Sequence, residues 1–133
     1  MYLLDTNLCI AALRRPAARV AARLRKHKVE ELFLSAVTVA ELFHGAWRSS
    51  RPAENAEVVR RFIGPFECLP FDHDCAEHAG EIRAQLDGVG TPIGPYDVLI
   101  AATARAHRLT LVTHNTREFQ RVVGVRLEDW EDA

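Results

Sequence analysis

Short apolar runs alternate along this chain with longer segments whose apolar residues recur at helical spacing. The apolar runs lie at residues 2–4, 32–34, 66–69 and 109–112, and residues 125–127 are a candidate fifth. Helices are expected over residues 6–13, 16–28 (opened by Pro16), 35 or 38 to 48, 52–63, 73–86 and from 94 onward. Such alternation is typical of a parallel sheet, because parallel strands need long crossover connections. We therefore predict an α/β fold, a three-layer sandwich with a central, mainly parallel sheet of 4–5 strands flanked by helices.

The composition is that of a globular chain. Hydrophobic residues make up 48% of the 133 residues and charged residues 26%, which predicts a single folded domain over residues 1–133. No apolar run approaches the ~20 residues that cross a bilayer, and the start lacks the basic region of a secretory signal. Cys9, Cys68 and Cys75 are odd in number and show no C-x-x-C spacing. We expect core cysteines, no membrane association and a reducing, cytoplasmic location.

Charge is unevenly distributed, although the net charge is only −1. The segment from Arg14 to Lys28 contains seven basic residues and no acidic residue, whereas the tail from Glu128 to Asp132 is acidic. The basic segment is either the solvated face of a helix or a patch that contacts phosphates. The sequence alone leaves both interpretations open.

The most apolar of the expected helices, IGPYDVLIAATA at residues 93–104, contains the carboxylate of Asp97. Residues three and four positions from Asp97 on a helix are Ile93, Gly94, Ile100 and Ala101, so its neighbours are apolar. Three other polar groups follow strands. Asp5 ends the first strand, Glu41 lies in the helix after the second, and residues 113–115 leave the fourth. In a parallel sheet these groups converge at the edge where ligands bind.

Each carboxylate also has a purely structural interpretation. Asp5 is a suitable helix N-cap, Asp97 suits the first turn of a helix, and Glu41 could be ordinary helix surface. Together, however, three converging carboxylates repel one another unless a cation compensates them. No lysine follows Lys28, so a hard divalent cation is the expected partner. Mg²⁺ suits an all-oxygen site, with Mn²⁺ as a possible substitute.

Several segments resemble the PIN-domain family, and more narrowly the VapC-type ribonuclease toxins of type II toxin–antitoxin systems. They are LLDTN at residues 3–7, SAVTVAEL..G at 35–45, LPFD at 69–72, GTPIGPYDVLIAATA at 90–104 and LTLVTHNTREF at 109–119. The similarity runs in order over nearly the whole chain. It implies a PIN-like version of the predicted α/β sandwich.

The resemblance also implies a set of site residues. The family's acidic site corresponds to Asp5, Glu41 and Asp97, which would be both catalytic residues and metal ligands. The family's further acidic position falls on Asn115, and Glu118 lies where relatives often carry an aspartate, so both join the candidate catalytic residues. The chain thus departs from the four-carboxylate pattern. Plausible supporting donors are Thr6, Asn7 and Thr113.

The function implied is a Mg²⁺-dependent endoribonuclease toxin that hydrolyses phosphodiester bonds in single-stranded or loop regions of structured RNA such as tRNA. The implied partners are a cognate antitoxin protein, received by Phe43 and Trp47, and a second copy of the chain in a homodimer. The basic segment, Arg48 and Arg117 would hold RNA phosphates. The main alternative is an inactive PIN-like RNA-binding or scaffold protein. A receiver domain and a small-molecule phosphatase fit less well, because neither the late lysine nor the second aspartate they need is present.

Overall fold

Five parallel strands form the central sheet of the computed structural model, which describes residues 1–131. The strand order is β3-β2-β1-β4-β5, so the first strand lies in the middle. The predicted parallel sheet is therefore confirmed. The strands are β1 (Tyr2–Leu4), β2 (Leu32–Ser35), β3 (Glu67–Leu69), β4 (Thr110–Val112) and β5 (Leu127–Glu128).

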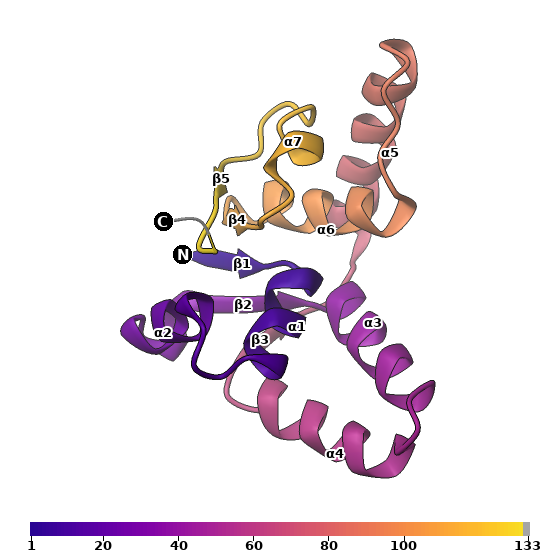
Figure 1. The fold of residues 1–133 in the computed structure, drawn as a ribbon. Coiled ribbons are helices and arrows are strands. Elements are labelled where there is room, and N and C mark those ends of the chain that lie inside the picture. Colours follow the sequence, from indigo (N-terminus) through magenta and orange to yellow (C-terminus); the bar gives the residue numbers. More distant parts are fainter. Residues whose placement is uncertain (132–133) are drawn as a thin grey trace.

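Helices cover both faces of this sheet, as Figure 1 shows. Helices α1–α4 lie on one side and α5–α7 on the other, which confirms the three-layer arrangement. Their bounds are α1 (Thr6–Arg14), α2 (Arg19–Lys26), α3 (Ala36–Trp47), α4 (Pro52–Ile63), α5 (His73–Gly88), α6 (Pro95–Ala106) and α7 (Thr116–Phe119), with a short 3₁₀ turn η1 (Val29–Glu31).

The central strand β1 contributes side chains to two hydrophobic cores, one on each face of the sheet. Side chains alternate across a strand, so Leu4 packs in the core under α1–α4, whereas Leu3 packs in the core under α5 and α6. Both are fully buried. A strand covered on both faces reads as a continuous apolar run, which is why the sequence indicates the strand so clearly.

The structure departs from the prediction most clearly in three elements. Pro16 does not open a helix: residues 16–18 form a turn, in which the Ala18 N–H donates to the Arg15 carbonyl at 2.9 Å, and α2 begins at Arg19. The fifth strand starts at Leu127 rather than residue 125, because Leu127 is paired with Leu111. Helix α7 was not predicted at all. Among residues 1–131, no helix is both long and apolar enough to cross a membrane.

Candidate active site

Asp5 follows β1 directly and is almost completely buried, with 4% of its surface exposed. The Leu8 N–H donates to Asp5 Oδ1 at 2.9 Å, so Asp5 does cap α1. Burial raises the pKa of Asp5 to about 6, opposed by hydrogen bonds from Thr113 and Leu8 and reinforced by the charge of Asp97. The structural interpretation of Asp5 is thus correct but incomplete, because a cap does not need to be buried beside another carboxylate.

Asp97 lies in the first turn of α6, behind the Gly94 cap and Pro95. It is half-buried, and burial raises its pKa to about 6. The negative charges of Glu118 and Glu41 add to this rise in pKa. The fold therefore brings three carboxylates from distant parts of the sequence within electrostatic range of Asp97, and we call Asp5, Glu41, Asp97 and Glu118 the acidic cluster.

Glu41 is positioned by a threonine of the neighbouring helix. The Thr6 hydroxyl donates to Glu41 Oε1 at 2.7 Å and lies 3.1 Å from the hydroxyl of Thr38. The Ser35 side chain, which caps α3, donates in turn to the Thr38 hydroxyl at 3.2 Å. Because Thr6, Ser35 and Thr38 are all buried, this network ties Glu41 to the rigid ends of β1 and β2.

Asn115 is not itself a carboxylate, but its side chain orients the carboxylate of Glu118. Its Nδ2 donates to Glu118 Oε2 at 2.9 Å, and its backbone N–H donates to the Thr113 hydroxyl, also at 2.9 Å. The four-residue helix α7 carries Glu118. Asn115 thereby links Glu118 to Thr113, the same residue that hydrogen-bonds Asp5.

One acidic residue of this region was not predicted. The charge of Glu131 contributes to the raised pKa of Asp5, so Glu131 lies within electrostatic range of the site. Asp129 accepts from His114 Nδ1 at 3.1 Å if that nitrogen is protonated, which ties the tail to the turn after β4. The acidic composition of residues 128–132 was the only available signal.

The acidic cluster offers oxygen atoms only and has no protein cation to balance it. Within residues 1–131, no Lys, Arg or His forms an ion pair with any of its four members. This chemistry fits a hard divalent cation such as Mg²⁺. In the described part of the chain, however, no three His, Cys, Asp or Glu side chains are arranged as a ready-made ligand set. Water and substrate oxygens would complete the coordination, as Mg²⁺ sites usually require.

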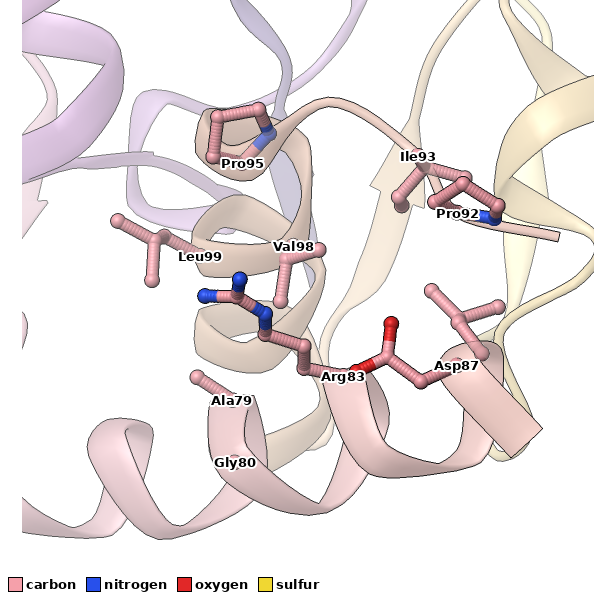
Figure 2. Close-up of a pocket in the computed structure, with 10 residues that line it drawn as sticks. Ala79, Gly80, Arg83, Asp87, Pro92, Ile93, Pro95, Val98 and Leu99 are labelled. Atoms are coloured by element: carbon pink, nitrogen blue, oxygen red, sulfur yellow. The ribbon is translucent and has the colours of Figure 1, made fainter. Parts of the chain in front are cut away.

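A groove of about 370 Å³ adjoins the cluster between α1, α3 and α4, and both Glu41 and Arg14 line it. Of the two aromatic residues predicted to face a partner, Trp47 is 54% exposed, whereas Phe43 packs against the core beneath the Arg60 guanidinium. A larger hollow of about 520 Å³ lies between α5 and α6 (Figure 2). It contains none of the predicted site residues.

The basic segment lies mostly elsewhere. Arg23 of α2 stacks over Trp130 at 5.2 Å and pairs with Glu128 at 4.0 Å, and Trp130 in turn packs on Tyr2 at the start of β1. Figure 1 likewise shows α2 at the end of the sheet where β1 and β2 begin, whereas α3 and α6 begin at the other end. Of the basic segment, only Arg14 lines the groove beside Glu41, and the contact of the segment with RNA phosphates stays a prediction.

The sequence and the structure are both similar to those of known proteins. A model of the PIN domain matches residues 2–125. The tRNA(fMet)-specific endonuclease VapC of Shigella flexneri is 42% identical over 129 residues, covering 97% of both chains, and Ribonuclease VapC2 of Haemophilus influenzae is 38% identical over the same length and share. A crystal structure of DNA-bound VapBC from Salmonella typhimurium has a chain that superposes with a TM-score of 0.92 at 41% identity, covering 97% of both chains.

Proposed function

This chain belongs to the PIN domain family, and from that premise we propose that it is an endoribonuclease toxin of a toxin–antitoxin pair. Its substrate would be a single-stranded or loop region of a structured RNA, with tRNA favoured because similar proteins are tRNA(fMet)-specific endonucleases. The observation that carries the proposal is the acidic cluster itself. Asp97 lies within range of the charges of Glu41 and Glu118, beside a buried Asp5, and no protein cation balances them in residues 1–131.

The residues of the acidic cluster would have different roles in phosphodiester hydrolysis. Asp5, Asp97 and Glu41 would hold a Mg²⁺ ion, for which Mn²⁺ could substitute. When bound, the ion supplies positive charge that offsets the negative charge developing on the phosphate. Glu41, oriented by Thr6, accepts the proton of the attacking water, with Glu118 as the second candidate base. Asn115 keeps Glu118 directed at the site.

RNA contacts would surround this cluster. Arg14 lines the groove beside Glu41, and Arg48 and Arg117 are exposed after α3 and on α7. Each guanidinium would bind a backbone phosphate. Tyr96 precedes Asp97 in α6 and is 59% exposed, so its ring is available for stacking on an unpaired base.

The proposed protein partner is an antitoxin, because the similar structures are toxin–antitoxin complexes. The groove between α1, α3 and α4 offers apolar side chains such as Leu13, Leu42 and Val58 next to Glu41. An antitoxin segment in this groove would both bury Val58 and cover the acidic cluster. We also propose a homodimer of the 14.9 kDa chain in the cytoplasm. Light scattering that gives a monomer at micromolar concentration would contradict the dimer.

The direct test is to incubate the purified protein with total tRNA and ribosomal RNA and to map the new ends. We expect a small number of cuts in loops that appear with Mg²⁺ and disappear with EDTA. RNA that is bound but never cut, in Mg²⁺ and in Mn²⁺, would instead support the alternative of an inactive RNA-binding PIN protein. Cuts that persist in EDTA would contradict the metal-dependent mechanism.

A further inference from the structure

Three arginines converge at the end of the molecule opposite the acidic cluster. They surround a hollow of about 260 Å³ at the end of α6 and the starts of β4 and β5. Asp97 lies in the first turn of α6, and this hollow lies beyond its last turn. With a rise of 1.5 Å per residue, the two ends are about 16 Å apart along the helix axis. The hollow is lined by Ala104, Arg105, Arg108, Leu109, Gly124 and Arg126.

Two of the three arginines are held in place by the fold. Arg105 donates from Nε to His78 Nδ1 at 2.8 Å and from Nη1 to the Val123 carbonyl at 3.0 Å, and its side chain is only 13% exposed. Its Nη2 also pairs with Glu81 at 3.1 Å, which offsets part of its charge. Arg126 donates from Nη2 to the Arg108 carbonyl at 2.8 Å. The positions of these guanidinium groups are therefore set before any ligand arrives.

Arg108 stands where the backbone favours glycine. Its φ is 56°, and among residues 1–131 no other non-glycine residue has a positive φ. It follows His107, the C-cap of α6, in the left-handed conformation, a position that glycine occupies without a steric penalty. Its side chain is exposed and forms no hydrogen bond or ion pair with any other residue among residues 1–131. A strained residue whose side chain has no structural partner points to a function for that side chain.

We propose that this hollow, which we call the arginine pocket, binds a backbone phosphate of the RNA substrate at a point remote from the cleaved bond. The inference rests on the proposed ribonuclease function. Guanidinium groups match phosphate oxygens in geometry and charge, and Arg108 brings an unpaired positive charge to the pocket. A folded RNA such as tRNA is large enough to contact both ends of α6, whereas a trinucleotide held at the acidic cluster is too short to reach a pocket about 16 Å away. The arginine pocket would thus favour large, folded RNAs over small fragments.

Two substitutions of Arg108 separate charge from backbone strain. Both Arg108→Gly and Arg108→Gln remove the guanidinium, but only Arg108→Gly also relieves the left-handed conformation. Arg61→Gln is the matched control, since Arg61 is an exposed arginine on α4. Binding of intact tRNA and of a trinucleotide is measured in EDTA, where no cleavage interferes, over a range of salt concentrations. Cleavage of both RNAs by the unchanged protein is measured in Mg²⁺.

Both variants should bind intact tRNA about fivefold more weakly, with a salt dependence smaller by about one phosphate contact. Their binding of the trinucleotide should not change, and only Arg108→Gly should raise the thermal midpoint. If both variants bind tRNA as tightly as the unchanged protein, the inference is wrong even though that protein cleaves RNA. Variants that lose affinity for the antitoxin but not for tRNA also overturn it. Failure of the unchanged protein to cleave any RNA is a separate result, which contradicts the proposed function instead.

Discussion

The Thr6 hydroxyl donates a hydrogen bond of 2.7 Å to Glu41 Oε1 and so joins the first turn of α1 to the second turn of α3. The two residues are 35 positions apart in the sequence. Each belongs to a helix that begins where a strand of the sheet ends. The orientation of Glu41 therefore depends on the packing of two strand–helix units and not on its own helix.

Replacing Thr6 by valine tests that orientation. Thr6→Val keeps the size of the side chain but removes the donor, so Glu41 loses its fixed direction. We expect the RNA cleavage rate to fall about tenfold or more, while stability falls by about 1 kcal/mol, the usual value of one hydrogen bond. Thr6→Ser, which restores the hydroxyl, should recover most of the rate. A fully active Thr6→Val protein would show that Thr6 has no positioning role.

Asn115 is the second residue whose substitution is informative. Asn115→Asp places a carboxylate 2.9 Å from Glu118, where an amide now donates. The two charges repel, so the thermal midpoint in EDTA should fall below that of the unchanged protein. Mg²⁺ should raise the midpoint more than it does in the unchanged protein, because a bound ion stabilises the folded state in proportion to its affinity. Asn115→Ala is the control. An identical Mg²⁺-induced shift in Asn115→Asp and the unchanged protein would contradict a metal near Glu118.

Stability without metal should decrease as the pH rises. The pKa values of Asp5 and Asp97 are raised from 3.8 to about 6 in the folded protein. Between these values the folded state binds more protons than the unfolded state, so its stability falls through this window. From pH 5 to pH 7, Asp5 alone should contribute a loss on the order of 1 kcal/mol, or about 3 °C in midpoint.

Calorimetry in EDTA and in Mg²⁺ checks this prediction. Mg²⁺ binds the ionised carboxylates and should flatten the pH profile, as should Asp5→Asn in EDTA. If the metal-free protein instead became more stable between pH 5 and pH 7, the prediction would be wrong. Such a result would mean that a positive charge of the protein compensates Asp5 and Asp97.

An acidic residue placed in the groove beside Glu41 should weaken the binding of the antitoxin. Val58 lines this groove and is 41% exposed, so Val58→Asp should leave the fold intact. A carboxylate buried in an apolar interface is costly, and antitoxin affinity should fall at least tenfold. Val89→Asp is the control, because Val89 is 63% exposed and does not line this groove. The affinity of each variant for the antitoxin is measured by calorimetric titration. Equal affinities of Val58→Asp and Val89→Asp would contradict the binding of the antitoxin in this groove.

The elements with strong apolar patterns could be predicted from the sequence. Strand β1 and helix α6 are buried on more than one side, so their apolar residues are continuous and unambiguous. Asp5 and Asp97 could be identified because each interrupts such a run. A parallel sheet then leaves few places for their carboxylates to lie.

Features set by contacts between distant segments could not be predicted. Helix α7 has only four residues, and its Asn115–Glu118 hydrogen bond has no signature in composition. The approach of Glu131 to Asp5 depends on the path of the chain after β5. Helix α2 packs its Val20, Ala21 and Leu24 in the core and stacks Arg23 on Trp130, a contact between residues 107 positions apart in the sequence. Neither its charge nor its periodicity specifies that partner.

The central claim is that Asp97 serves a metal-dependent ribonuclease site. Asp97→Asn keeps the shape of the side chain but removes one ligand and one charge from the acidic cluster. The matched control is Asp87→Asn, which changes an exposed residue near the end of α5, outside the cluster (Figure 2). The measurement is the rate of Mg²⁺-dependent tRNA cleavage, together with the thermal midpoint in EDTA. We predict that Asp97→Asn abolishes cleavage and leaves the metal-free midpoint unchanged or higher, while Asp87→Asn remains active. An Asp97→Asn protein that cleaves tRNA at the full rate would contradict the claim.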